Sequence, residues 1–324
     1  MSEPNGQNEG KRLGRAARRR RIRESNCGEV ISDAKFKIFR EWLKSSGFPK
    51  AKLTLANFGE TGRGMMATKD IEEGEIIVSV PEKYLMTHRS LSKVYYGTDH
   101  SLNSHQLLAL HVALQRRLGP RSSWRPYIDM LPVDFDTVAV TFEERLGVLL
   151  PRCVQEEVGS QRSKIQADYA CVSEFLKMKK CPLPSSSSIL TYKEFEWAWL
   201  CVNTRCIFLD TKNDVAKGGN IALAPMLDFL NHTWEAQIQS GFDEATKCYQ
   251  IRTLIPYKKG QQVTICLVYY ICSIPHGVNI HSPHTHRSSS TTARMTTISS
   301  SRSTVSSSRA TPTTTCRWTM NSWS

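Results

Sequence analysis

The chain has 324 residues, 40% of them hydrophobic, which is enough for the core of one large or two medium-sized domains. Its formal net charge is +13, but residues 1–26 and 287–324 each carry +5, so the middle of the chain has little excess charge. This distribution gives no sign of a nucleic-acid-binding surface in the middle of the chain. No apolar run approaches the roughly 20 residues of a membrane span.

Ten cysteines are scattered along the chain without a Cys-x-x-Cys pair. Cys201 and Cys206 have no second pair at the distance that a zinc finger needs. We interpret the cysteines as free thiols of a reducing compartment and expect no metal site. Because the N-terminus lacks the apolar segment of a secretion signal, we expect a soluble protein in the nucleus, the cytoplasm or both.

Residues 1–26 form a polar segment that includes KRLGRAARRRRIR. This composition cannot bury enough apolar surface to offset the entropy of ordering, so we expect a disordered basic arm. The basic run is also compatible with a nuclear address or with weak contact to an acidic partner such as nucleic acid.

The first predicted helix lies in DAKFKIFREWLKSSGFP. Its apolar face carries Phe36, Phe39, Trp42 and Leu43, and the glycine and proline that follow end it.

A glycine-rich segment, GETGRGMMATKDIEEGEIIVSVP, comes next. Gly59, Gly62 and Gly64 indicate a loop that leads to a strand, which is entered through the Glu73–Gly74 turn and ends at Pro81. Since no helix follows the glycines, a dinucleotide-binding loop is excluded.

Residues from about 100 to 205 have mainly helical patterns. HQLLALHVALQRRLG repeats apolar residues at helical spacing and ends at Gly119, and residues 161–178 and 192–204 continue the pattern on either side of the loop CPLPSSSS. SSWRPYIDMLP, between the first and second of these helices, is predicted to be a loop because prolines interrupt it.

Strand signals return after His232. AQIQSGFDEATKCYQIRTL is typical of a hairpin with its turn at residues 243–246, and YKKGQQVTIC adds a turn at Lys259–Gly260 and another strand. Two strand-rich blocks therefore flank the helices. We expect one α+β domain over residues 27–266 with a helical insertion at about 100–205; two separate domains are the alternative.

The composition changes after Cys266. No Asp or Glu follows Glu244, and 22 of the 38 residues at 287–324 are Ser or Thr. We expect residues 267–324 to be a disordered low-complexity tail. We interpret this tail as the product of a retained intron followed by an out-of-frame exon.

Polar groups stand out in the otherwise apolar segments WAWLCVNTRCIFL and MLDFLNHT. Arg205 ends an apolar helix, and Asp228, Asn231 and His232 fall within five residues of each other. Because burying such groups without partners costs a few kcal/mol each, we expect a ligand or a structural polar network to satisfy them. Arg205 is also compatible with an ordinary surface position.

Five segments occur together in a characteristic order: TGRGMMATKDIEEGEIIVSVP, SSWRPYIDMLP, WAWLCVNTR, ALAPMLDFLNHT and GQQVTIC. Over residues 30–266 they resemble the SET-domain protein methyltransferases with a helical insertion, the group of the Rubisco large-subunit and actin-histidine methyltransferases. The resemblance implies a β-rich domain of short sheets with a pseudoknot, and S-adenosylmethionine as cofactor.

The resemblance also implies roles for individual residues. The backbone of the loop at residues 61–64 would wrap the cofactor, Arg205 would lie beside its carboxylate, and Asp228 would hold the segment in which Asn231 and His232 bind the cofactor. The implied cofactor-binding positions are Thr61, Gly62, Arg63, Gly64, Arg205, Asp228, Phe229, Leu230, Asn231 and His232.

The family tyrosine, which follows the strand that matches QQVTIC, has Leu267 in its place. Tyr269 and Tyr270 lie nearby but lack the glycine that follows the family tyrosine, so no catalytic residue is assigned. The helical C-terminal substrate-binding domain of the family has no match in residues 267–324.

Three functions remain open on the sequence. The resemblance favours a monomeric methyltransferase that modifies a lysine of a protein substrate such as a histone. The missing tyrosine supports a catalytically impaired protein that only binds S-adenosylmethionine. The basic arm alone supports a chromatin or nucleic-acid adaptor.

Overall fold

The computed structural model describes residues 27–59, 61–95, 102–178, 190–209 and 220–266. The predictions for the basic arm, the loop CPLPSSSS and the tail at 267–324 lie outside these residues. The α-helices are α2 (Ala34–Ser45), α3 (His88–Tyr95), α4 (Ser104–Leu118), α5 (Arg125–Ile128), α6 (Glu144–Gly147), α7 (Arg152–Met178) and α8 (Tyr192–Arg205). The strands are β1 (Glu29–Val30), β2 (Leu53–Phe58), β3 (Gly62–Ala67), β4 (Ile76–Pro81), β5 (Met86–Thr87), β6 (Ile207–Phe208), β7 (Ile221–Leu223), β8 (Asn231–His232), β9 (Ile238–Asp243), β10 (Cys248–Thr253) and β11 (Gln262–Ile265).

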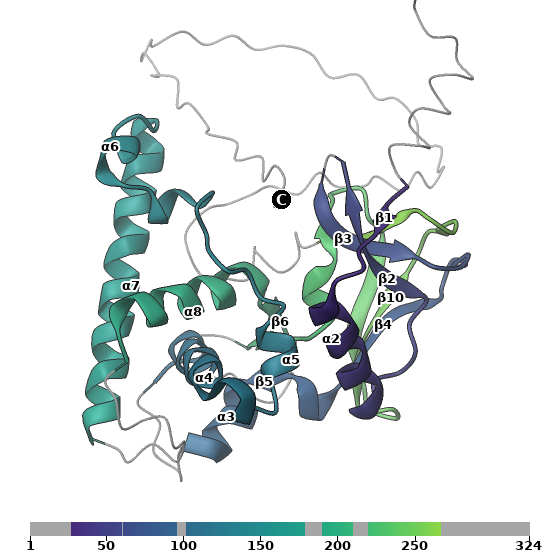
Figure 1. The fold of residues 1–324 in the computed structure, drawn as a ribbon, viewed down its shortest axis with the longest axis horizontal. Coiled ribbons are helices and arrows are strands. Elements are labelled where there is room, and N and C mark those ends of the chain that lie inside the picture. Colours follow the sequence, from purple (N-terminus) through teal and green to yellow (C-terminus); the bar gives the residue numbers. More distant parts are fainter. Residues whose placement is uncertain (1–26, 60, 96–101, 179–189, 210–219, 267–324) are drawn as a thin grey trace, which may run out of the picture. The chain divides into compact units, whose positions relative to one another are not determined.

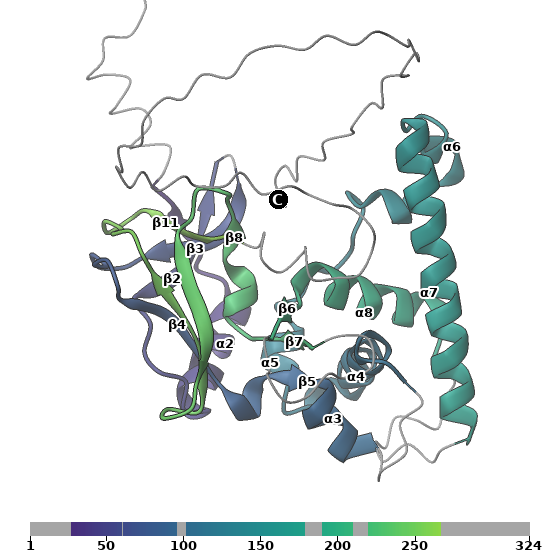
Figure 2. The ribbon, with the colours of Figure 1, turned by 180° about the vertical axis from the view of Figure 1, so that it is seen from behind.

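The strands form three small sheets, and each sheet joins segments from both sides of the helical region. The largest has the order β1-β2-β3-β11-β8, the second β4-β10-β9 and the third β5-β7-β6. β11 pairs antiparallel with β3 on one side and parallel with β8 on the other. Figure 2 shows β3, β11 and β8 next to one another. The predicted fold class, α+β with short sheets split by helices, is confirmed.

The central helix of the insertion is α4, which is buried on nearly all sides. A capping box starts it: Asn103 accepts from the backbone of Gln106, whose side chain accepts from the backbone of Asn103. It ends at Gly119, which has a φ of 52°. α4 packs mainly on α8, and Figure 1 shows both helices with α7 on the side away from the β2–β4 strands.

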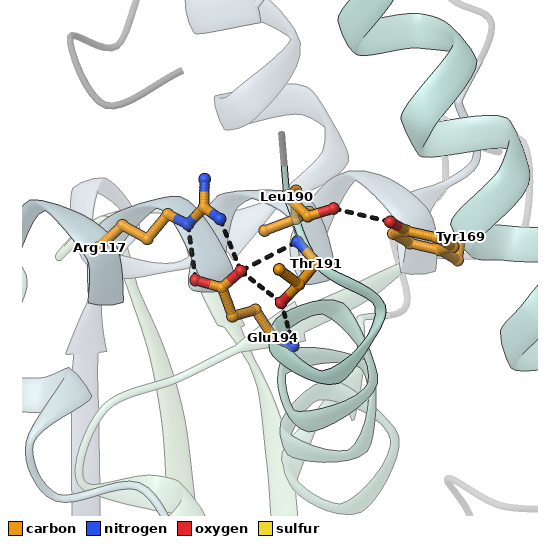
Figure 3. Close-up of polar contacts among 5 residues, drawn as sticks. All are labelled: Arg117, Tyr169, Leu190, Thr191 and Glu194. Carbon is orange, nitrogen blue, oxygen red and sulfur yellow. Dashed lines mark hydrogen bonds and ion pairs between the residues drawn. The ribbon is translucent and has the colours of Figure 1, made fainter. Parts of the chain in front are cut away.

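A polar cluster fastens α4, α7 and the start of α8 together (Figure 3). Thr191 and Glu194 form the capping box of α8. Glu194 also accepts two hydrogen bonds from Arg117 near the end of α4, at 2.7 and 2.6 Å. From α7, the Tyr169 hydroxyl donates to the carbonyl of Leu190 at 2.7 Å. These contacts fix the direction in which α8 runs toward its last residue, Arg205.

The predicted amphipathic helix is confirmed as α2. Phe36, Phe39 and Leu43 are buried, and the ring of Trp42 packs against Trp124 with centroids 5.8 Å apart. Asp33 caps the helix by accepting from the backbone of Lys35. The hairpin of β9 and β10 and the turn at Gly260, which has a φ of 89°, also lie where the sequence predicts them.

Three local predictions were wrong. Residues 125–128 form α5 rather than loop, because Pro126 lies in the first turn, where a helix needs no backbone N–H from it. α7 begins at Arg152 rather than at residue 161, since Val154 and Val158 extend its buried face. Gly62 and Gly64 belong to strand β3 and not to a loop before a strand.

Within the described ranges, no helix is long and apolar enough to cross a membrane. Those same ranges contain no group of three His, Cys, Asp or Glu side chains that could hold a metal ion. None of the seven cysteines that they include forms a disulfide there.

Candidate functional site

The candidate site is built around the segment from Met226 to His232. Met226 has a φ of 74°, a left-handed conformation that residues other than glycine rarely adopt. A single 3-10 turn, Leu227–Phe229, follows and leads into β8. Leu227 and Phe229 are buried and anchor the segment in the core. Backbone strain of this kind is concentrated at functional sites, and the polar residues between these anchors are therefore candidates for a functional role.

Asp228 is the most buried charged group of the segment. Its side chain is 0% exposed and accepts from the Tyr127 hydroxyl at 3.0 Å and from Arg205 Nη1 at 3.3 Å. Arg205 Nη1 also donates to the Asp228 carbonyl at 3.0 Å. Burial raises the pKa of Asp228, and this rise is partly offset by Arg205 and by the Tyr127 hydroxyl. Burial also raises the pKa of Tyr127. The segment is therefore fastened to α5 and to the end of α8.

This polar network is incomplete. In the part of the chain that the structure describes, the buried atoms Asp228 Oδ1 and Arg205 Nε have no hydrogen-bond partner. Leaving a buried polar atom unpaired costs about 1–3 kcal/mol, so a purely structural network would be expected to satisfy both. The Arg205 side chain retains 16% exposure, so one edge of the network reaches the surface.

Asn231 connects β8 with the start of β3. Its side-chain amide donates to the Arg63 carbonyl at 3.2 Å and more weakly to the Thr61 carbonyl at 3.5 Å. The Thr61 hydroxyl in turn donates to Gln262 Oε1 of β11 at 3.0 Å. A Cβ atom at Gly64 would lie 2.8 Å from Asn231 Nδ2, so only glycine allows this close approach.

A second guanidinium reaches the same region from β3. Arg63 is an exposed residue, but its guanidinium Nη2 extends to the Met130 carbonyl at 3.5 Å, a part-buried contact. The guanidinium carbons of Arg63 and Arg205 each lie 5.9 Å from the ring centroid of Phe229. Burial and the neighbouring Arg205 lower the pKa of Arg63, against the attraction of Asp228 and of the exposed Asp33.

His232 pairs with Ile265 at the end of β11. Partial burial lowers the pKa of its imidazole, although a backbone hydrogen bond with Ile265 acts in the opposite direction. Leu230 is buried beside it. Leu267, Tyr269 and Tyr270, considered above for the catalytic tyrosine, lie outside the described residues.

The structure thus places the candidate residues of three separate segments in one region: the start of β3, the end of α8 and the residues around β8. Sequence reasoning missed Tyr127, Met130 and Gln262 as members of the site. Tyr127 and Met130 lie in SSWRPYIDMLP and Gln262 in GQQVTIC, so the motifs pointed to the right segments without indicating which side chains take part.

A scan against protein-family models matches residues 62–266 to the SET domain. Among curated proteins, the chain is 33% identical to SET domain-containing protein 4 of Homo sapiens over 82% of its own length and 62% of that protein. It is 29% identical to the actin-histidine N-methyltransferase of Homo sapiens, over 76% of this chain and 43% of that protein. The chain therefore spans about three fifths or less of the length of these relatives.

Solved structures give the same fold. The SET domain of LSMT bound to lysine and AdoHcy matches with a TM-score of 0.58 and 18% identity, over 72% of this chain and 53% of that one. Rubisco LSMT bound to AdoMet matches with a TM-score of 0.55 and 20% identity over the same shares.

Proposed function

Because this chain belongs to the SET-domain family, we propose that it is an S-adenosylmethionine-dependent methyltransferase whose target is a lysine side chain of a protein such as a histone. The observation that carries the proposal is the incomplete polar network at Asp228 and Arg205, next to the strained Met226. The solved relatives were captured with AdoMet or AdoHcy, and one of them with lysine.

The residues of the site fit this cofactor. Its amino-acid end carries a carboxylate, and Arg205, whose side chain keeps 16% exposure, is a suitable donor for that group. The backbone of residues 61–64 and the amide of Asn231 border the same region and supply polar groups for the rest of the molecule. Tyr127 and Asp228 keep Arg205 in place, so they act as positioning residues.

When bound, the cofactor supplies an electrophilic methyl group on a sulfonium sulfur. The neutral amine of the target lysine attacks the methyl carbon, the bond from that carbon to sulfur breaks, and the nitrogen releases a proton. The protein contributes alignment and a partly desolvated environment, which lowers the pKa of a lysine and so favours its neutral form. Lysine is the first choice of target; the relatives that are named for actin histidine make histidine the competitor.

The test is transfer of a radiolabelled methyl group from S-adenosylmethionine to histones and to a cell extract, followed by analysis of which amino acid carries the label. We expect label on lysine, and loss of label in the variant Asn231→Ala. Gln239→Ala is the matched control, because Gln239 is an exposed amide residue on β9. Label on histidine alone would overturn the lysine assignment.

A second candidate function is binding of the cofactor without transfer. It is supported by Leu267 at the position of the family tyrosine. Calorimetry with S-adenosylhomocysteine separates the two candidates. Binding without any labelled product selects the second, whereas a folded protein that does not bind this compound contradicts both.

A further inference from the structure

Beyond the proposed function, on which this inference rests, we propose that the Arg63 side chain is a second ligand for the carboxylate of the cofactor. The resemblance to the family concerns only the backbone of residues 61–64. The structure directs the guanidinium of Arg63 to the same aromatic ring that Arg205 contacts, with both guanidinium carbons 5.9 Å from the centroid of Phe229.

The charges in this region do not balance. Arg205 pairs with the buried carboxylate of Asp228, whereas Arg63 reaches the same Phe229 ring without an ion pair of its own among the described residues. Among the described residues, the other acidic group that acts on Arg63 is Asp33, which is exposed and already caps α2. Two cations that share a partly desolvated region repel each other, and an anion placed between them removes that cost. A carboxylate ligand is such an anion.

The existing contacts of Arg63 leave its guanidinium available. In the described residues its one hydrogen bond goes to the Met130 carbonyl at 3.5 Å, the upper limit for such a bond. A guanidinium has five N–H donors, so most of them remain for a ligand. By contrast, Arg205 already uses Nη1 for both the carbonyl and the carboxylate of Asp228. Arg63 is therefore the less constrained of the two cations and the better placed to close onto a ligand.

The experiment compares two ligands that differ only in the carboxylate: S-adenosylmethionine and its decarboxylated form. Their dissociation constants are measured by calorimetry for the full chain and for Arg63→Gln, Arg63→Lys and Arg40→Gln. Arg40 is the matched control, since it is an exposed arginine on α2. Thermal unfolding of each variant establishes that it is folded.

We expect Arg63→Gln to weaken binding of S-adenosylmethionine about 10- to 100-fold, the range for a hydrogen bond to a charged group, and to leave the decarboxylated ligand within about twofold. Arg63→Lys should recover part of the loss, and Arg40→Gln should match the parent chain. The proposal is overturned if Arg63→Gln binds S-adenosylmethionine normally, or if it loses both ligands equally. A parent chain that binds neither ligand would instead contradict the proposed function itself.

Discussion

At the scale of single residues, Asp228 is the position where we expect the largest effect on stability. Asp228→Ala leaves the guanidinium of Arg205 buried without its carboxylate, a loss that typically costs about 3–5 kcal/mol. Tyr127→Phe removes only one hydrogen bond to the same carboxylate and should cost about 1 kcal/mol. Urea unfolding followed by circular dichroism measures both. Equal costs for the two variants would contradict the central role of Asp228.

Gly64 is the second residue at which a substitution should clearly lower the stability of the fold. A methyl group there would lie 2.6 Å from Gln262 Nε2 and 2.8 Å from Asn231 Nδ2, so Gly64→Ala should destabilise the fold by about 1–3 kcal/mol. Gly241→Ala in β9 is the matched control, because no atom lies within 4 Å of its added Cβ. Equal stability of Gly64→Ala and Gly241→Ala would contradict this expectation and show that the side-chain amides of Gln262 and Asn231 move away from the added methyl group.

The site could be predicted from the sequence only in part, and the reason is visible at this scale. Asp228, Asn231 and Arg205 could be predicted because they are polar residues within otherwise apolar segments of the sequence. Tyr127 does not, since a tyrosine among prolines and aromatic residues has no local feature that marks a partner 101 positions away. Such pairings are decided by tertiary packing, which local patterns do not encode.

At the scale of elements, the polar cluster at the start of α8 should make the stability of the fold depend on pH. Arg117 and the Thr191 hydroxyl and backbone lower the pKa of Glu194 from its usual 4.5 to about 2. A lowered carboxylate pKa contributes stability that is present above pH 4.5 and is lost as the pH falls toward 2. Glu194→Gln should therefore lower the melting temperature at pH 7 and flatten its fall below pH 4.5. Glu156→Gln, in an exposed pair with Arg152, should change neither.

Helix α4 adds a second pH effect at higher pH. His111 is buried, its Nδ1 lies 2.8 Å from the Tyr95 hydroxyl, and burial lowers its pKa from 6.5 to about 4. The unfolded chain takes up the proton first, so His111 lowers the stability by about 3 kcal/mol as the pH drops from 6.5 toward 4. The ring nitrogens of His105 on the same helix are also buried, which lowers its pKa to about 3 and adds to the fall over the same range. His111→Gln, which cannot titrate, should reduce this slope. An unchanged slope in unfolding experiments between pH 7 and 4 would contradict the assignment.

The elements themselves were largely predictable because their signals are local. The apolar periodicity of α2, α4 and α8 and the turn residues of the β9–β10 hairpin lie within each segment. Helix α5 was not predicted, because the prolines around it suggest a loop. A proline in the first turn of a helix, such as Pro126, is nevertheless tolerated. The first two turns of α7 are mostly polar, and only Val154 and Val158 face the core there.

At the scale of the whole molecule, the shared sheets predict cooperative unfolding of the described part of the chain. β3 pairs with β11, and β4 with β10, so neither strand-rich block completes a sheet without the other. Tryptophan fluorescence, which reports on Trp42, Trp124 and Trp199 among others, should therefore give the same urea midpoint as far-UV circular dichroism. Two separate midpoints would favour the alternative of independent domains.

The position of β11 between β3 and β8 also bears on how the protein is made. A ribosome releases the partners of this strand first, since β3 and β8 both precede it in the chain. Until Gln262–Ile265 emerges, the edge of β3 and the polar side chains around Asn231 lack their neighbour. Chaperones that shield nascent chains would protect this edge until then, and a slowing of translation once Gln262–Ile265 has left the ribosome would favour correct closure of the sheet.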